Sequence, residues 1–572
     1  MTKKVEKNWI YQGFICLLIL GIYGYGVSHI WGMCIYPDEF GYWSTAARMA
    51  GWDWSQITSL GSYYSFGYSI LLYPILMLTS DSVAAYRLAV MLNAVLMCVA
   101  SFLLQKMGEE LFPNRSEMYR ILLSGISVLY PSWIFYMQTT MTEAILAFMV
   151  ILVGYLFLKL LEKPGVINAI LLSLAVGYTY TLHMRAVGLV IACILTVLIW
   201  GILEKKSRKS TLVVILCIIL VFFCAYSIKE VVQENIYSGS GLLEVNDYGG
   251  QVGKIKSLFS SQGIKSILLL VAGKTLYLNL ASGGLVLWGI WRNIKNSFQL
   301  LQEIRKRKPI TSQYLFSLYL VLLFLGELGI NCIYTIKSVT LDNLLYGRYI
   351  EFIAPIYVFW GGICIGEEFL KKRHLSKILL PYMISFLALV LGVWNTLEGY
   401  IRGVHSAILN IFIQRDKLNP LFFVVTIGSL GLLYLFVTSF LLRFVVAKKG
   451  RELVLMFFII LNLLLGISNS SCIIYTGNDN IRMDLTLLNL MEDRIASEDE
   501  VMFLVEGENQ WIAFLQMQLR DEKIQALKPE ELKNLVAEDT ILFTYWDSKY
   551  LEELDKIYEQ KVMGDLYYLY YN

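Results

Sequence analysis

The stretch CIYPDEFGYW places Asp38 and Glu39 directly after the first apolar run of the sequence, with aromatic residues behind them. A carboxylate at the edge of a membrane can take a proton from an attacking hydroxyl, because partial burial raises its pKa toward that of a useful base. The same acids also suit the start of a helix, with Asp38 as N-cap and Glu39 in the first turn. Capping accounts well for one acid and less well for the second.

Further ionisable residues stand at the ends of later apolar runs. Glu143 ends the stretch QTTMTE, Arg185 ends YTLHMR, and Arg348 lies within YGRYIE. Lys274 lies inside another apolar run, near 266–291. An ionisable side chain in a membrane is costly, so it marks either a function or a buried charged partner. Their concentration at one membrane face, argued below, favours a functional site.

The composition is that of an integral membrane protein. Of the 572 residues, 57% are hydrophobic and 16% are charged, and the mean hydropathy is +0.58, so the apolar share exceeds that of an average soluble domain. The net charge of +3 is small and the basic residues are scattered, which argues against a nucleic-acid partner. Most cysteines lie inside apolar runs and form neither a metal-ligand spacing nor a disulfide framework.

About 13 apolar runs are long enough to cross a hydrocarbon layer roughly 30 Å thick. They lie near residues 10–32, 83–104, 119–137, 141–161, 165–182, 186–203, 211–229, 266–291, 314–336, 347–368, 377–399, 419–446 and 452–474. Two stretches, 44–50 and 62–78, are too short to span and are expected to lie at the interface, within the first external loop. The predicted fold is an α-helical polytopic membrane protein with about 11–13 transmembrane helices.

Basic residues set the expected orientation, because cytoplasmic loops are enriched in Lys and Arg. If Lys3, Lys4 and Lys7 lie inside, later basic stretches fall on the same side, namely KKSRK at 205–209, RKRK at 305–308, KKRH at 371–374 and KKGR at 448–451. The stretch with Asp38 and Glu39 then faces outward. The expected location is a bacterial cytoplasmic membrane, crossed many times, with the N terminus in the cytoplasm.

The sequence changes character after about residue 475, which divides a transmembrane domain over 1–474 from a C-terminal domain over 475–572. Strands are expected near 501–505, 523–527, 540–545 and 566–570, with helices near 511–519, 529–536 and 550–558. This alternation predicts a small α/β domain with a largely parallel sheet. An odd number of spans places it outside the cell. It carries no phosphate-binding loop, so a lid or stabilising cap is favoured over substrate recognition.

Taken together, the motifs resemble the GT-C glycosyltransferases. The resemblance rests on the acidic pair at Asp38 and Glu39, the Thr/Glu stretch ending at Glu143, Arg185, and YGRY around Arg348 followed by Pro355. The stretch 63–104, with Arg87 and Asn93, fits the same pattern. The branch that it resembles contains protein O-mannosyltransferases and lipid A aminoarabinose transferases. The similarity covers about residues 1–370.

The resemblance implies a large outer cavity, a sugar donor carried on polyprenyl phosphate, and inversion at the anomeric carbon. It matches Asp38 to the usual base, with Glu39 as helper or metal ligand, although the reverse assignment stays open. A leaving lipid phosphate needs fixed cations, for which Arg185, Lys274 and Arg348 are the candidates. Tyr42, Glu143 and Tyr349 are the candidates for substrate contacts. The acceptor is expected to be a glycan, a glycolipid or a protein, and membrane lipids surround the chain.

A divalent metal ion is an open question. Some relatives bind one through a carboxylate and a histidine, and the candidates here are Glu39, His29 and His183. His405 also lies on the outer side, but scattered histidines have no ligand spacing, which favours structural roles for them.

Two alternative classes of function remain. A transporter or flippase of lipid-linked sugars would use intramembrane charges such as Glu327, near the midplane of broken and internally repeated helices. A polysaccharide polymerase or ligase would carry its essential residues in a later external loop, for instance 400–418 with Arg402 and His405.

Overall fold

A computed structural model describes residues 2–35, 38–240, 252–365, 372–413, 418–446, 450–479, 481–482, 485, 500–506, 510–537 and 540–572. Within these residues, ten helical segments are long and apolar enough to cross a membrane. They are built on α1 (Thr2–Val27), α5 (Ser82–Leu111), α8 (Thr142–Glu162), α10 (Val187–Leu203), α11 (Arg208–Ile236), α13 (Ser261–Ser282), α15 (Ser312–Thr335), α19 (Lys372–Val393), α20 (Pro420–Val446) and α21 (Arg451–Ser470). The chain is therefore a multi-pass α-helical membrane protein, as its composition predicts.

Some predicted spans are divided or shorter in the structure. The run near 119–137 forms α6 (Glu117–Val128) and α7 (Pro131–Met137). Pro131 disfavours helical geometry at the preceding Tyr130, whose ψ is 129°. The run near 165–182 is α9 (Val166–Leu182), an apolar helix of 17 residues.

Two later runs also differ from single helices. The run near 347–368 forms α17 (Arg348–Glu351) and α18 (Ala354–Cys364), and its last three residues lie outside the described part of the chain. The run near 266–291 ends with α13 at Ser282, because Gly283 and Gly284 both adopt left-handed backbone conformations. A separate helix, α14 (Leu285–Arg305), follows this turn.

The loop between α1 and α5 contains the short helices that the sequence predicts. These are α2 (Asp38–Ala50), α3 (Ser55–Thr58) and α4 (Ser69–Leu78). Ser69 Oγ at the start of α4 donates a hydrogen bond to the carbonyl of Tyr42 in α2 at 2.7 Å, so the two helices pack together. Residues 36–37, which precede the acidic pair, lie outside the described residues.

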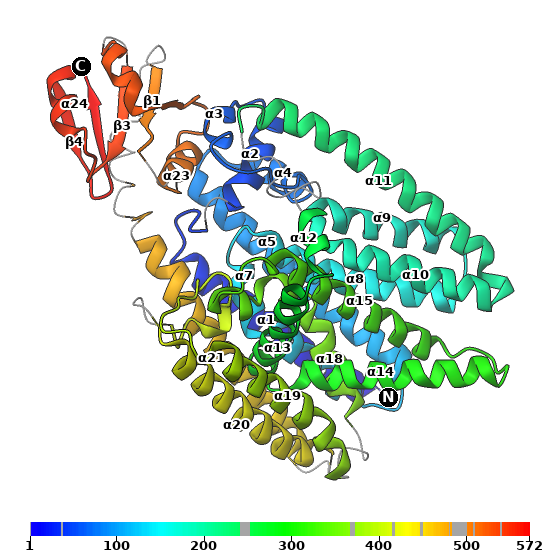
Figure 1. The fold of residues 1–572 in the computed structure, drawn as a ribbon. Coiled ribbons are helices and arrows are strands. Elements are labelled where there is room, and N and C mark those ends of the chain that lie inside the picture. Colours follow the sequence, from blue (N-terminus) through cyan, green and yellow to red (C-terminus); the bar gives the residue numbers. More distant parts are fainter. Residues whose placement is uncertain are drawn as a thin grey trace.

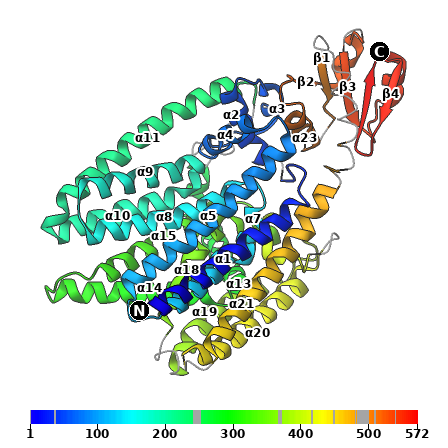
Figure 2. The ribbon, with the colours of Figure 1, turned by 180° about the vertical axis from the view of Figure 1, so that it is seen from behind.

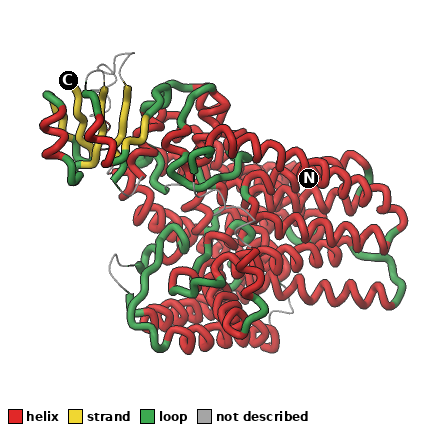
Figure 3. Tube along the Cα trace, turned by 45° about the horizontal axis from the view of Figure 1, so that its top comes forward, coloured by secondary structure: helices red, strands yellow, loops and turns green. Residues whose placement is uncertain are grey.

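The C-terminal region forms a five-stranded sheet, drawn in yellow in Figure 3. Its strands are β1 (Glu500–Leu504), β2 (Gln525–Leu527), β3 (Thr540–Tyr545), β4 (Gln560–Met563) and β5 (Tyr567–Tyr571), in the order β2-β1-β3-β5-β4. The pairs β1/β2 and β1/β3 are parallel, whereas β3/β5 and β4/β5 are antiparallel. The sheet is therefore mixed rather than largely parallel. The sequence prediction missed β4, because this edge strand is only four residues long and mostly exposed.

Helices in this region are α23 (Gln510–Gln518), the 3-10 helix η8 (Pro529–Asn534) and α24 (Leu551–Ile557). We call residues 500–572 the sheet domain. Figures 1 and 2 show the sheet domain at one end of the helix bundle, beside α2, α3 and α4, and the N terminus at the opposite end. The bundle thus presents the first loop and the sheet domain at the same end.

Candidate active site

Asp38 begins α2 and is held by two side chains from distant parts of the sequence. The hydroxyl of Tyr64 donates a hydrogen bond to Asp38 Oδ1 at 2.8 Å, and Arg348 Nη2 donates to Asp38 Oδ2. Gly41, one turn further along α2, lets the Tyr64 ring lie against the helix. A β-carbon at Gly41 would lie only 2.3 Å from that ring. The sequence thus uses a glycine to bring the phenol to the carboxylate.

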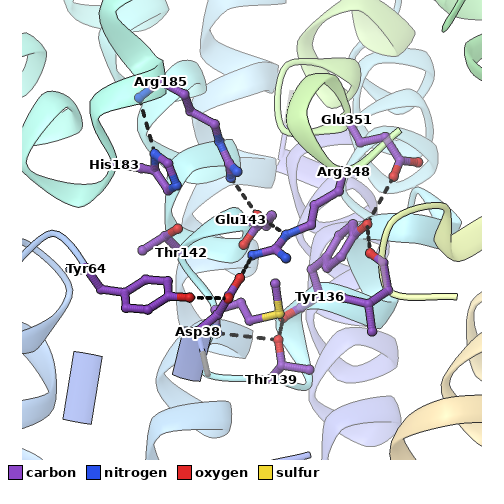
Figure 4. Close-up of polar contacts among 12 residues, drawn as sticks. Asp38, Tyr64, Tyr136, Thr139, Thr142, Glu143, His183, Arg185, Arg348 and Glu351 are labelled. Atoms are coloured by element: carbon purple, nitrogen blue, oxygen red, sulfur yellow. Dashed lines mark hydrogen bonds and ion pairs between the residues drawn. The ribbon is translucent and has the colours of Figure 1, made fainter. Parts of the chain in front are cut away.

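Glu143 is the acid in the first turn of α8, and it binds two arginines through one oxygen. Arg185 Nη2 lies 2.6 Å from Glu143 Oε1, and Arg348 Nε lies 2.7 Å from the same atom. Asp38, Glu143, Arg185 and Arg348 therefore form an ion network of two acids and two bases, which Figure 4 shows pointing toward one another. The Asp38 side chain is the most exposed of the four, at 17%, whereas the others are at most 6% exposed. The network is therefore reached most directly at Asp38.

Arg185 lies in a single 3-10 turn, η1 (Met184–Ala186), between α9 and α10. Its guanidinium carbon lies 4.4 Å from the ring centroid of Tyr349 and 5.5 Å from that of Phe352. Its Nε and Nη1 are buried and have no hydrogen-bond partner among the residues that the structure describes, and the same holds for Glu143 Oε2. Buried donors without acceptors are rare in proteins. Two donors and one acceptor in the network are therefore available to a ligand.

Glu327 supports the element that follows Arg185. Its Oε1 accepts a hydrogen bond from the backbone N–H of Leu189 at 2.8 Å, in the first turn of α10. The first N–H groups of a helix lack partners within the helix, so this carboxylate acts as a cap supplied by α15. One oxygen of this intramembrane acid thus caps α10, whereas its Oε2 is buried and has no hydrogen-bond partner among the residues that the structure describes.

Arg348 is positioned through its backbone by a segment near residue 405. The N–H groups of Gly347 and Arg348 both donate to the carbonyl of His405 at 2.9 Å. The His405 ring stacks on Tyr346 with centroids 4.2 Å apart, and its Nδ1 lies 2.7 Å from Asp342 Oδ2. Residues 342–348 and 402–406 are therefore bound together at the start of α17, the helix that begins with Arg348.

Glu39 does not join the ion network, although it follows Asp38. Successive helical residues point about 100° apart, and the Glu39 side chain is fully buried between α2 and α5. Its Oε2 accepts hydrogen bonds from Tyr86 at 2.6 Å and Thr140 at 3.1 Å. Burial raises the pKa of Glu39 to about 7. The two neighbouring acids thus occupy different environments.

The remaining predicted cation is also separate from the network. Lys274 Nζ donates to the carbonyl of Asn343 at 2.5 Å and lies 5.5 Å from the ring centroid of Tyr346. Its side chain is fully buried. Within the described chain it has no ion-pair contact with Glu143 or Asp38. Tyr346 therefore stands between Lys274 and the rest of the site.

The predicted substrate-contact residues lie beside the ion network. Tyr42 is hydrogen-bonded through its hydroxyl to Thr142 Oγ1 at 3.2 Å, one residue before Glu143. The Tyr349 ring packs against Arg185, as described above, and its centroid lies 4.8 Å from that of Tyr346. Both rings therefore border the charged groups.

The candidate metal ligands lie apart from one another. The His29 ring packs against Tyr25 and Tyr475, with centroids 4.7 and 5.0 Å away. His183 Nδ1 accepts the backbone N–H of Arg185 at 3.2 Å, and burial together with the Arg185 charge lowers the pKa of His183. Among the described residues, no three His, Cys, Asp or Glu side chains come together as a metal site requires.

Several contacts of the site were not predicted from the sequence. Tyr64 stands in the aromatic stretch SYYSFGYS, in which no spacing distinguishes it from its neighbours. Glu351, one turn after Arg348, is buried and accepts a hydrogen bond from Tyr130 at 3.0 Å. Burial raises the pKa of Glu351 to about 7. The pairing of Asp342 with His405 could be predicted only in part. The sequence places both residues in loops on the outer side, but it does not indicate that they pair.

Comparisons with known proteins identify the fold. No family model matches the sequence, and no curated protein matches it. The structure is similar to ArnT from Cupriavidus metallidurans crystallised with undecaprenyl phosphate, with a TM-score of 0.55 at 11% identity, covering 98% of this chain and 97% of that one. It is also similar to the apo state of the same protein, with a TM-score of 0.51 at 12% identity, covering 99% and 98%. These matches cover 98% and 99% of this chain and confirm the GT-C fold that the sequence predicts.

Proposed function

We propose that this chain, which has the GT-C fold, is a membrane glycosyltransferase that moves a sugar from a polyprenyl-phosphate donor to an acceptor hydroxyl. The observation that carries the proposal is the ion network, in which Asp38, the most exposed acid, pairs with Arg348, and Arg348 shares Glu143 with Arg185. An acid beside fixed cations is what the transfer of a sugar from a phosphate needs. The match to ArnT bound to undecaprenyl phosphate supports a lipid-linked donor.

The phosphate-binding role falls first to Arg185 and then to Arg348. Arg185 offers two buried N–H donors without partners in the described chain, and the Tyr349 ring fixes the plane of its guanidinium. Arg348 already pairs with two carboxylates, so it can bind the phosphate only when one of these ion pairs breaks. Arginine suits this task, because its planar fork matches phosphate oxygens in pairs.

In the proposed step, the acceptor oxygen attacks the anomeric carbon while the bond from that carbon to the phosphate oxygen breaks. The acceptor proton passes to the Asp38 carboxylate, and the polyprenyl phosphate leaves with the bonding electron pair. The charge that develops on the phosphate is stabilised by the arginines. Attack opposite to the leaving group inverts the anomeric centre. Glu143 Oε2, which has no partner among the described residues, is the acceptor we assign to a sugar hydroxyl.

The other predicted site residues receive supporting roles in this proposal. Glu39 joins α2 to Tyr86 and Thr140, so it positions Asp38 rather than reacting. Lys274 is held by the Asn343 carbonyl behind Tyr346, and we place it outside the phosphate site. Tyr42 and Tyr349 border the space that substrate would enter.

For the orientation, we propose a cytoplasmic N terminus and an outward-facing site and sheet domain. The N terminus lies at the end of the bundle opposite the sheet domain, and the basic stretch at the end of α14 contains Arg305 in its last helical turn. Lys371 and residues 448–449 of the other basic stretches lie outside the described residues. We keep the division into a transferase domain over 1–474 and an outer domain over 475–572.

The test is a transfer assay combined with analysis of the bound lipid. The full chain, purified in detergent, is extracted for lipid mass spectrometry and then reconstituted with polyprenyl-phosphate sugars and candidate acceptors. A co-purified polyprenyl phosphate, and sugar transfer that is lost in Asp38→Asn, are the expected results. Lipid-linked sugar that crosses the vesicle membrane without transfer would instead support a flippase, and would overturn the proposal.

A further inference from the structure

Aromatic rings connect α2, the helix that begins with Asp38, to the sheet domain. Phe40 stacks on Trp54 with ring centroids 5.6 Å apart and planes 7° apart. Trp54 stacks in turn on Trp52 at 6.4 Å and 14°. The guanidinium carbon of Arg520 lies 4.9 Å from the Trp52 centroid. We call Phe40, Trp54, Trp52 and Arg520 the ring stack; it runs from the first turn of α2 to the sheet domain.

The sheet-domain end of the ring stack is fixed by further hydrogen bonds. Arg520 Nη1 donates to the carbonyl of Thr79, just after α4, at 2.5 Å. The indole N–H of Trp54 donates to the Arg520 carbonyl at 2.9 Å. The turn that carries Arg520 is shaped by Gln516, whose fully buried amide donates to the carbonyl of Leu519 at 3.1 Å. Arg520 is therefore held in place on both sides.

The ring stack is more buried than the ion pair between Lys523 and Asp53 that lies beside it. Phe40 and Trp54 are 3% and 2% exposed, and Trp52 and Arg520 are partly buried. Lys523 and Asp53, which also join the sheet domain to this loop, are 52% and 36% exposed. An exposed pair of this kind contributes little to stability. Stacked aromatic rings and a cation over a ring contribute more when water is excluded. The ring stack is thus the more buried of the two connections, above all at Phe40 and Trp54.

We propose that Arg520 is a positioning residue for Asp38, acting through Trp52, Trp54 and Phe40. Phe40 lies two residues after Asp38, so a shift of α2 that loosens this ring also moves the carboxylate away from Arg348. A hydrogen bond weakens steeply when its geometry is lost. The sheet domain then supports the reaction by holding the first loop in register with α8 and α17. The effect of Arg520 on sugar transfer rests on the proposed function, whereas its effect on the position of α2 does not.

The mechanical part is tested by hydrogen exchange on the full chain in detergent. In Arg520→Ala, and in Trp52→Ala as a second variant, amide exchange over residues 38–50 should increase about tenfold relative to the parent chain. Lys523→Ala is the matched control, because it removes the neighbouring exposed ion pair and leaves the ring stack intact. Unchanged exchange of α2 in Arg520→Ala, or an equal increase in Lys523→Ala, would overturn the proposal. This readout requires no sugar transfer.

The catalytic part is tested by transfer kinetics on the same variants. We expect Arg520→Ala to lower kcat about tenfold or more, with little change in the donor KM, because the arginines that bind phosphate are untouched. Arg520→Lys should recover most of this loss, since an ammonium keeps the positive charge over Trp52. An unchanged kcat in Arg520→Ala contradicts the proposal. If α2 loosens as expected while the parent chain transfers no sugar, the proposed function fails and the positioning of α2 by Arg520 stands.

Discussion

Asp38 and Arg348 form an ion pair across 310 positions of sequence. Together with Tyr64, Arg348 occupies both oxygens of the Asp38 carboxylate. A donor phosphate that engages Arg348 competes with Asp38 and leaves Oδ2 free to accept a proton. In the proposed reaction the base is therefore exposed by the donor itself, and the donor should bind before the acceptor.

The first prediction concerns the base. Asp38→Asn should lower kcat by about 10²–10⁴-fold, the usual contribution of a positioned general base, while the chain still inserts and folds. Initial rates of sugar transfer from polyprenyl phosphate measure this loss. Tyr64→Phe is the control: it removes one hydrogen bond to Asp38 and keeps the carboxylate, so it should cost far less. Full activity of Asp38→Asn would remove the assignment.

The second prediction concerns the phosphate site. Arg185→Ala should raise the donor KM by about 10–100-fold, because charge-assisted hydrogen bonds to the leaving group are lost. Lys274→Met should leave the donor KM close to that of the parent chain, since its ammonium is bound to the Asn343 carbonyl. Titration of the donor at saturating acceptor measures both. The reverse ranking of these two variants would assign the phosphate to Lys274.

Arg348→Ala should also weaken donor use, and it should destabilise the chain as well. Removing one partner of a buried ion pair costs about 3–5 kcal/mol, because the remaining charges are left uncompensated. Thermal unfolding in detergent, followed beside donor kinetics, separates the two effects. Unchanged donor kinetics in this variant would contradict the role of Arg348.

The third prediction is a pH dependence of stability from Glu39. Burial raises the pKa of Glu39 from 4.5 to about 7 in the folded chain, so between these values the folded state holds a proton that the unfolded state has lost. Stability from this group is complete below about pH 4.5, falls as the pH rises toward 7, and stays low above it. The total loss is about 3 kcal/mol.

Glu39→Gln reproduces the neutral form and should remove this loss. Its unfolding midpoint should match that of the parent chain below about pH 4.5, exceed it increasingly up to about pH 7, and keep that excess above pH 7. Glu351 has a pKa raised in the same direction, so the difference between parent and variant is the quantity to compare. A constant difference between pH 4.5 and 7 would contradict the buried neutral state of Glu39.

The fourth prediction concerns the contact between Asp342 and His405. His405→Ala and Asp342→Asn should each raise the donor KM, because both loosen the segment whose carbonyl holds the N–H groups of Gly347 and Arg348. The double variant should cost little more than either single one, since the two side chains act as a unit. A polymerase or ligase with His405 at the acceptor would instead show changed acceptor kinetics and an unaffected donor KM.

The sequence predicted the elements of the membrane domain better than the environment of each site residue. Charged residues at helix ends could be selected as site candidates, because a charge in a membrane is costly. Four of these candidates, Asp38, Glu143, Arg185 and Arg348, meet in one network. Glu39 and Lys274 are also ionisable residues in or beside apolar runs, so the sequence does not distinguish them from these four. Their separation from the network depends on helix rotation and on Tyr346, neither of which composition or spacing specifies.

The C-terminal domain shows a similar limit. Strands β1 and β3 are buried apolar runs and were predicted, whereas β4 is recognisable only through its pairing with β5. The docking of Arg520 on Trp52 had no sequence signal, since both residues lie in turns far apart in the chain.

The order of residues in the ion network also matters while the chain is being made. Arg185 follows Glu143 by 42 residues, so the two charges can neutralise each other early during insertion into the membrane. Arg348 follows Glu143 by 205 residues, and until it arrives Asp38 lacks its cationic partner. A nascent chain therefore carries a balanced buried pair, and the ion network stays incomplete until Arg348 is in place.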